Sequence, residues 1–219
     1  MTQVTAYEQI LAGIAEAERA AGRAAGAVKL VAVSKSFPAD AIRRVYERGE
    51  RRFGESRVEE LIEKAAALPK DIEWHFIGHL QNNKVKKVLE HAQVIHSVDS
   101  VRLLERIDRL AEELGKKPRL LLEVNVSGEE SKYGFAASAL AAAVQRAREL
   151  ENIELVGLMT MAPLVATAQE LKSIFSTLKR AADEMGLCEL SMGMSGDYAE
   201  AVACGATLVR IGSAIFGGR

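Results

Sequence analysis

From residue 29 onward the sequence alternates between short apolar or β-branched runs and longer stretches with the spacing of amphipathic helices. The short runs predict strands at 29–35, 52–56, 74–78, 94–99, 119–126, 154–160, 189–195 and 208–212. The intervening stretches predict helices at 38–49, 57–68, 81–91, 101–115, 136–150, 168–186 and 197–205. Because parallel neighbouring strands need a crossover connection, this order predicts βαβ units and a parallel sheet.

Such a series of strands and helices fits either an open doubly wound sheet or a closed (β/α)8 barrel. An open sheet often carries a glycine-rich phosphate turn after its first strand, but here that strand ends in VAVSKSFP, which has no glycine. The eighth strand is followed only by residues 213–219, too few for a full final helix, so we expect the amphipathic segment 4–23 to cover that flank. We therefore predict one α/β domain over residues 1–219, a single (β/α)8 TIM-type barrel with an additional amino-terminal helix.

The charge balance and the hydropathy pattern argue against several classes of partner. Lys and Arg total 29 and Asp and Glu total 30, so the chain lacks the basic excess typical of proteins that bind nucleic acid or anionic membranes. No apolar run reaches the roughly 18 residues of a spanning helix, and the amino terminus lacks the apolar core of a signal peptide. Cys188 and Cys204 form no CxxC pair and no disulfide framework. We expect a cytoplasmic protein without a nucleic-acid or membrane partner.

The first strand ends in a lysine, Lys35, at a position where barrels place function. Active sites of (β/α)8 barrels lie at the carboxyl ends of the strands, and lysine is disfavoured within strands. Most lysines at strand ends are solvated, and this is the commoner interpretation of Lys35. The alternative is chemical: a lysine amine can attack an aldehyde and form a Schiff base.

The last strand supplies a second candidate feature. LVRIGSAIFGG places Gly212 and Ser213 just beyond the strand, where free backbone N–H groups can hold a phosphate. Ser195, in SMGMSGD after the seventh strand, can donate its hydroxyl to the same anion. The alternative is a tightly packed glycine-rich final turn, and the spacing does not decide between the two.

Histidines and a charged helix provide weaker signals. His75 and His79 are four residues apart on a predicted strand, which does not match a helical metal-binding pair, so we expect no metal site there. We expect His96 at the solvent or at a sheet edge. Glu60 and Lys64 belong to a charged run that predicts a solvated helix face with pairs four residues apart.

Ordered motifs over nearly the whole chain resemble one known family. They are KLVAVSK (29–35), FGES (53–56), WHFIGHLQNNK (74–84), SVD (97–99), NVSGEESKYGF (125–135), GLMTMAP (157–163), LSMGMSGD (190–197) and VRIGSAIFG (209–217). By these motifs the chain resembles the pyridoxal phosphate homeostasis proteins (YggS/PROSC-like), which are related to the amino-terminal barrel of alanine racemase. The resemblance implies a (β/α)8 barrel that binds pyridoxal 5′-phosphate (PLP).

The resemblance also implies a role for individual residues. The lysine of KLVAVSK, which is Lys35, forms the Schiff base with PLP. The arginine of the VRxG-type motif, which is Arg210, faces the pyridine nitrogen. Backbone amides at Gly212 and Ser213 and the hydroxyl of Ser195 hold the phosphate.

Two further positions bear on the site, and only the first follows from the comparison with the family. The family usually reads Gly-Glu-Asn after the second strand, whereas this chain has Ser56 in place of the asparagine, and a serine hydroxyl can donate one hydrogen bond over a shorter reach. Lys132, in SKYGF, is a second amine near the barrel mouth that can receive the aldehyde by transimination. The alternative for Lys132 is an ordinary solvated loop lysine.

These features favour cofactor handling over catalysis. A cation at the ring nitrogen disfavours the pyridinium form, so the ring is a weaker electron sink. Racemisation also needs an acid and a base on opposite faces of the substrate carbon. A second domain supplies one of them in alanine racemase, and because the sequence ends at Arg219 we expect no such domain here.

We therefore expect a PLP carrier or buffer in vitamin B6 and amino-acid homeostasis, without robust catalysis. We expect it to be a monomer, with apo forms of PLP-dependent enzymes as recipients of the cofactor. Two alternatives stay open at this stage. One is a small PLP-dependent amino-acid racemase that uses Lys35 and a group such as His79 as its bases. The other is a class I aldolase-like barrel, whose lysine more commonly lies late in the barrel.

Overall fold

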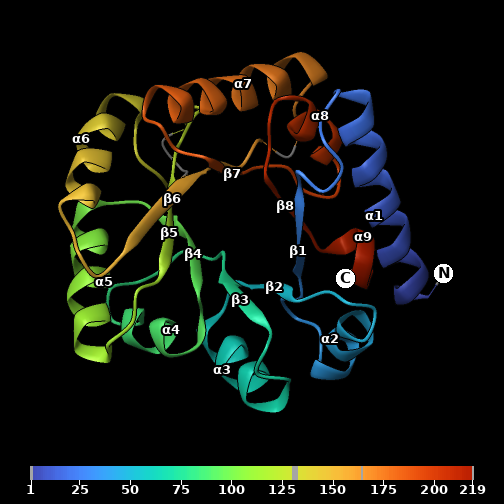
Figure 1. Cartoon of the computed structure of the whole chain (residues 1–219), viewed down its shortest axis with the longest axis horizontal. Helices are drawn as coiled ribbons and strands as arrows, with labels where there is room; N and C mark the ends of the chain where they lie inside the picture. The colour runs from blue at the N-terminus through green and yellow to red at the C-terminus, as the bar shows by residue number, and fades with distance from the viewer. Residues whose placement is uncertain (1, 130–132, 164, 219) are drawn as a thin grey trace.

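Eight parallel strands close into a barrel in chain order, and helices surround it (Figure 1). The computed structural model describes residues 2–129, 133–163 and 165–218. The strands are β1 (Lys29–Val33), β2 (Arg52–Glu55), β3 (Glu73–Phe76), β4 (Val94–Val98), β5 (Arg119–Glu123), β6 (Glu154–Met159), β7 (Glu189–Ser191) and β8 (Leu208–Ile211). The helices are α1 (Gln3–Ala20), α2 (Ala39–Tyr46), α3 (Val58–Ala67), α4 (Val85–His91), α5 (Val101–Leu114), α6 (Ala137–Arg148), α7 (Ala168–Glu184), α8 (Tyr198–Ala203) and α9 (Ser213–Phe216). The predicted (β/α)8 barrel with an additional amino-terminal helix is confirmed.

The main differences from the predicted elements lie at the carboxyl ends of β5 and β7. The predicted strands 119–126 and 189–195 were too long, since β5 ends at Glu123 and β7 at Ser191. Val124 forms an isolated bridge to Phe135 and still donates to the Met159 carbonyl oxygen (2.8 Å), and the regular pairing of β7 with β6 ends at Ser191. Apolar residues continue past both strand ends, so a hydropathy pattern cannot locate the point at which pairing stops. These extensions are the loops that shape the barrel mouth.

The barrel closes where β8 pairs with β1, and α1 covers the outside of this seam. Val31 of β1 pairs with Arg210 of β8. Helix α1 packs against α2, α8 and α9, as predicted for the segment before the first strand (Figure 1). Beyond α1, Arg23 donates hydrogen bonds to the carbonyl oxygens of Val202 (3.0 Å) and Ala206 (2.6 Å). The segment that follows α1 is thereby tied to the loop before β8.

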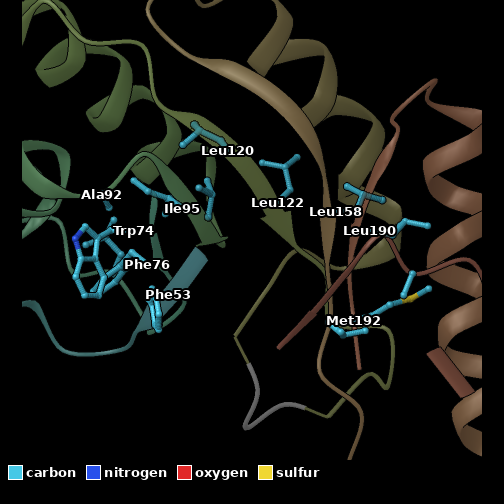
Figure 2. Packing of buried hydrophobic residues seen from close by; sticks show 14 of the residues in the cluster. Phe53, Trp74, Phe76, Ala92, Ile95, Leu120, Leu122, Leu158, Leu190 and Met192 are labelled. Carbon is cyan, nitrogen blue, oxygen red and sulfur yellow. The ribbon is translucent and has the colours of Figure 1, made fainter. Parts of the chain in front are cut away.

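The outward faces of the strands pack beneath the helices and form most of the hydrophobic core (Figure 2). Phe53 and Trp74 lie with their ring centroids 6.1 Å apart, and Phe76 lies beside them. On other strands Leu158 and Leu190 continue the same layer (Figure 2). Each such side chain contributes about 1.5–3 kcal/mol when fully buried, so this layer supplies most of the driving force for closure.

The barrel interior contains polar side chains as well as a small apolar cluster. A small separate apolar cluster consists of Val31, Val94, Leu121, Met159 and Leu208. The fully buried His96, expected at the solvent or at a sheet edge, lies inside the barrel, so that expectation was wrong. Its ring is hydrogen-bonded to the Ser191 hydroxyl of β7, a strand that is not a neighbour of β4, so this contact crosses the interior.

In the described parts of the chain, no helix combines the length and the apolar character needed to cross a membrane. Cys188 and Cys204 are free thiols.

Close approach of β6 and β7 requires glycine at position 157. A Cβ atom there lies 1.9 Å from the backbone oxygen of Glu189, far inside van der Waals contact. We predict that Gly157→Ala lowers the free energy of unfolding by about 3 kcal/mol, because neither backbone can move without breaking the ladder. Urea denaturation measures this change. The control is Gly218→Ala, whose Cβ meets nothing within 4 Å; equal stability of the two variants contradicts the tight approach.

Candidate functional site

A cavity of about 440 Å³ opens at the carboxyl ends of the strands. All six residues that the sequence nominated line it: Lys35, Ser56, Ser195, Arg210, Gly212 and Ser213. They come from the segments after β1, β2 and β7 and from β8 with its following turn. Apolar side chains such as Ile77 and Leu171 complete the wall. The volume falls within the roughly 300–1,000 Å³ typical of small-molecule sites.

Lys35 stands at the rim of this cavity on a tightly held turn. It lies beyond the end of β1, its side chain is exposed, and the next residue, Ser36, has a left-handed backbone with φ of 67°. The backbone N–H of Ser36 donates to Glu60 (2.6 Å), and the Ser34 hydroxyl donates to Glu55 (2.6 Å). Hydrogen bonds on both sides of Lys35 therefore fix the backbone from which its amine projects.

Lys64 of α3 joins these contacts into one buried cluster. Its ammonium donates to the carbonyl oxygen of Ser34 (2.9 Å), to Glu55 (2.8 Å) and to Glu60 (2.8 Å). The side chain of Lys64 is only 8% exposed, so the predicted solvated face was wrong, although the predicted pair with Glu60 is present. Burial raises the pKa of Glu55 even beside this cation. We call Glu55, Glu60 and Lys64 the turn clamp.

Hydroxyl and backbone N–H groups from the segments after β7 and β8 converge at the same cavity. The Ser213 hydroxyl lies 3.1 Å from that of Ser195, and the backbone N–H of Ala214 donates to Ser195 Oγ (3.4 Å). Ser213 begins α9, whose first N–H groups have no partner within the helix. Gly212 packs so closely on Val33 that a Cβ lies 3.1 Å from the Val33 carbonyl oxygen. This arrangement of donors suits an anion.

The loop that presents Ser195 is closed on itself. The Asp197 carboxylate accepts the backbone N–H of Met194 (2.5 Å), and the Asp197 N–H donates back to the Met194 carbonyl oxygen (3.2 Å). Gly193 precedes this loop with φ of 93°, and a Cβ there lies 2.6 Å from the Ala201 methyl carbon. Only glycine satisfies both conditions, so the position of Ser195 depends on the backbone before it.

Arg210 forms the inner wall of the cavity. Its guanidinium donates to Ser191 Oγ through Nη1 (2.6 Å) and to the carbonyl oxygen of Thr160 through Nη2 (3.0 Å). Within the described residues, no carboxylate lies at ion-pairing distance from it. Burial lowers the pKa of Arg210 to about 10, so the side chain remains a cation at neutral pH. The site therefore contains a positive charge that can only donate hydrogen bonds.

Glu123, at the end of β5, is a buried titratable group that the sequence did not single out. It is 5% exposed, and burial, followed by the charge of Asp99, raises its pKa to about 7. Arg210 acts in the opposite direction by favouring the carboxylate. A carboxyl group near the barrel mouth is therefore divided between its two protonation states at neutral pH.

Ser56 and His79 lie at different cavities. Ser56 lines the cavity, and its backbone oxygen is so near Gly78 that a Cβ there would lie at 2.2 Å. His79 does not line this cavity but a separate open depression, where it contacts Asp99 (3.2 Å) and stacks on Tyr133 (ring centroids 3.8 Å apart). Lys132 lies outside the described residues.

Comparison with known families and proteins gives a consistent result. The family model for the amino-terminal domain of alanine racemase matches residues 11–219. A pyridoxal phosphate homeostasis protein of Deinococcus radiodurans is 45% identical over 208 residues, covering 94% of this chain and 97% of that protein. The human protein of the same name is 40% identical over 216 residues, covering 87% of this chain and 76% of that protein.

Solved structures match over nearly the whole chain. PipY of Synechococcus elongatus with PLP bound is 42% identical with a TM-score of 0.82, covering 93% of this chain and 100% of that one. An alanine racemase of Clostridium difficile is 17% identical with a TM-score of 0.70, covering 95% of this chain and 56% of that one. At that identity the racemase shares the fold alone.

Removing the ammonium of the turn clamp leaves a buried carboxylate without its cation. We predict that Lys64→Met lowers the free energy of unfolding by about 3 kcal/mol, the usual cost of breaking a buried pair from one side. The double variant Glu55→Gln with Lys64→Met recovers part of this loss, because the uncompensated charge is then absent. Urea denaturation at pH 7 measures both, with Lys86→Met, an exposed lysine, as control. A stability for Lys64→Met equal to that of the control contradicts the clamp.

The raised pKa of Glu123 makes its contribution to stability depend on pH. The folded protein binds more protons at this group between pH 4.5 and about 7, so its contribution is present below pH 4.5 and lost as pH rises through 7. We compare the unfolding free energy of Glu123→Gln with that of the wild type at each pH. We predict that this difference, variant minus wild type, increases by about 2–3 kcal/mol from pH 4.5 to pH 8. Denaturation at both pH values measures the gain. Glu151→Gln, at an exposed position, is the control. If the stability difference between Glu123→Gln and the wild type is the same at both pH values, the raised pKa of Glu123 is contradicted.

Proposed function

The chain belongs to the pyridoxal phosphate homeostasis protein family, and from this membership we propose that it binds PLP and serves as a carrier or buffer of this cofactor in vitamin B6 and amino-acid homeostasis. The observation that carries the proposal is the convergence of an amine, a cation and an anion-binding turn on one cavity. Lys35, Arg210 and Ser213 all line that space of about 440 Å³. When bound, PLP supplies an aldehyde that condenses with amines and a pyridine ring that withdraws electrons.

The residues present suit the three chemical parts of PLP. Lys35 projects its amine at the rim and holds the aldehyde carbon through a Schiff base. Ser195 and Ser213, with the backbone N–H groups at Gly212 and beyond, hold the phosphate. Arg210 would donate to the ring nitrogen, and the apolar side chains of the cavity would cover the ring. Ser56 lines the same wall and offers its hydroxyl to the ring substituents.

Arg210 also explains why carriage is favoured over catalysis. A guanidinium has no acceptor, so it donates to a ring nitrogen that carries no proton, and such a ring stabilises a carbanion poorly. Racemisation further requires a second acid or base opposite the lysine. His79, the candidate for that role, lies at a separate depression and is engaged with Asp99 and Tyr133. The racemase alternative is therefore not favoured.

The route of delivery belongs to the same proposal. Lys35 is exposed at the rim, so an amine of another protein can reach the carbon that it holds. Apo forms of PLP-dependent enzymes are the proposed recipients, and the proposed state is a cytoplasmic monomer.

Covalent capture by one particular lysine tests the proposal. We predict that the wild-type protein soaked in PLP gains a visible absorbance band, and that borohydride then fixes a mass increment of one PLP on Lys35. Lys35→Ala loses both signals. The control is Lys29→Ala, an exposed lysine at the other end of the same strand, which retains both. A wild-type protein that stays colourless, or an equal mass increment on Lys35→Ala, contradicts the proposed function.

The same loaded protein distinguishes a carrier from a racemase. Alanine or serine incubated with it in deuterated buffer keeps its Cα proton if the protein only carries PLP, and proton NMR of the amino acid measures this. Rapid exchange at Cα would show that Arg210 does not suppress the electron sink and that the protein is an enzyme.

A further inference from the structure

A continuous series of hydrogen bonds leads from Arg210 through the barrel interior. Arg210 Nη1 donates to Ser191 Oγ (2.6 Å), which lies 2.8 Å from His96 Nδ1. His96 Nε2 lies 2.8 Å from His75 Nδ1, and His75 Nε2 lies 2.7 Å from a carboxylate oxygen of Glu73. The five residues come from β8, β7, β4 and β3, so the series crosses the interior rather than following one side (Figure 1). We call it the interior chain.

The far end of the interior chain lies at the opposite end of the barrel from the candidate site. Glu73 and Arg119 are the first residues of β3 and β5, and Arg119 donates to Glu73 (2.6 Å). Together with Lys29, Glu189 and His75, they line a small cavity of about 80 Å³ among the amino-terminal ends of the strands. The interior chain therefore connects a charged cluster at one end of the barrel with the PLP site at the other.

The chemistry of the two ends fixes the direction of every hydrogen bond between them. Ionised Glu73 can only accept, so His75 Nε2 carries a proton. A neutral His75 then accepts at Nδ1, and His96 must donate from Nε2. A neutral His96 in turn accepts at Nδ1 from the Ser191 hydroxyl, which leaves Ser191 Oγ to accept from Arg210. Each donor meets an acceptor, and both histidines have the Nε2–H tautomer.

The electrostatic surroundings keep both histidines neutral and Glu73 ionised. Burial lowers the pKa of His75 and lowers that of His96 far below its usual range, and the cations Arg119 and Arg210 act in the same direction on His96. The hydrogen bond from His75 is the main cause that lowers the pKa of Glu73 to about 2, and Arg119 adds to it. These shifts favour a single direction of the interior chain at neutral pH.

We propose that His75, His96 and Ser191 are positioning residues for Arg210, held in one direction by Glu73, so that the remaining guanidinium N–H groups point into the cavity. The inference rests on the proposed function, because the ring nitrogen of PLP is the acceptor that those N–H groups meet. A guanidinium anchored only by the Thr160 carbonyl oxygen could rotate about that contact. A second anchor at Ser191 Oγ removes this freedom.

The hydroxyl of Ser191 is the central link. It accepts from Arg210 and donates to His96, so it cannot rotate to serve another partner without leaving one of them unpaired. Hydrogen bonds in such a series polarise one another, and the carboxylate at the far end strengthens the acceptor that Arg210 meets. Through the interior chain, the Glu73 carboxylate therefore strengthens the hydrogen bond that Arg210 donates to Ser191, although Glu73 and Arg210 are not in contact.

Nitrogen NMR of the protein without PLP tests the direction of the interior chain. The sequence has only four histidines, so ¹⁵N-histidine labelling gives an interpretable spectrum. We expect His75 and His96 to show protonated Nε2 and unprotonated Nδ1, and each to titrate below the ordinary pKa of histidine. A protonated Nδ1 on either ring, or titration of either ring near its ordinary value, overturns the assignment.

Substitutions test the link to the cofactor site. Glu73→Gln keeps the size of the side chain but can donate as well as accept, so we expect altered ring-nitrogen signals for His75 and His96. Ser191→Ala removes the shared hydroxyl, and we expect PLP to bind roughly tenfold more weakly, with a shifted visible band. Glu189→Gln, which removes a charge at the same end of the barrel but outside the interior chain, is the matched control and retains wild-type values.

The outcomes separate this inference from the proposed function. Unchanged affinity and absorbance in folded Ser191→Ala overturn the positioning role even if the tautomers are as expected. Should Ser191→Ala not fold, Glu73→Gln carries the same test, since its side chain is a third exposed and keeps its shape. Equal shifts in Glu73→Gln and Glu189→Gln show a general field effect and also overturn it. A wild-type protein that binds no PLP refutes the proposed function, whereas the NMR result still decides the direction of the interior chain.

Discussion

The buried guanidinium of Arg210 constrains how the other residues of the site are arranged. Arg210 is 5% exposed and contacts no carboxylate among the described residues, so oriented dipoles supply its hydrogen bonds, while the more distant charges of Glu123 and Asp197 favour its charged form. The Thr160 carbonyl oxygen and the Ser191 hydroxyl oxygen accept from Arg210, and Ser191 Oγ also lies 2.8 Å from His96 Nδ1. Interiors of (β/α)8 barrels are usually filled with Val, Ile and Leu. Here polar groups occupy part of the barrel interior. Their burial lowers the stability, and replacing them with apolar residues of similar volume would recover it.

Much of the fold was predictable because hydrophobic alternation is a local property. Eight strands were identified in order, and the six residues nominated for the site line one cavity. His96 was misassigned because its hydrogen bond to Ser191 joins strands that are neither adjacent in sequence nor paired in the sheet. Lys64 was misassigned although a signal existed: it lies among Val58, Leu61 and Ala65 on the buried stripe of α3. A charged residue on an apolar stripe indicates a buried partner. The i,i+4 spacing of Glu60 and Lys64 instead favoured the interpretation of an exposed pair.

Two independent groups of residues hold the two reactive parts of the site. The turn clamp acts on Lys35 from α3, outside the barrel, whereas the interior chain acts on Arg210 from within. They share no residue and reach the cavity from opposite sides of the strand layer. A change in one is therefore expected to leave the other in place, and their energetic effects should add, as is usual for distant sites without common partners.

Because the turn clamp and the interior chain hold their residues in place before a ligand binds, the entropic cost of ordering the site on binding is smaller. A ligand that meets a site already in place pays little to order side chains, so the affinity of the non-covalent contacts is retained in full. In the proposed carrier, the fixed groups around the ring and the phosphate would hold the cofactor while its bond to Lys35 is exchanged. The exposed position of Lys35 leaves the covalent bond as the part open to an incoming amine. Under the proposed function, chemistry at one carbon atom at the rim would control release, without opening of the barrel.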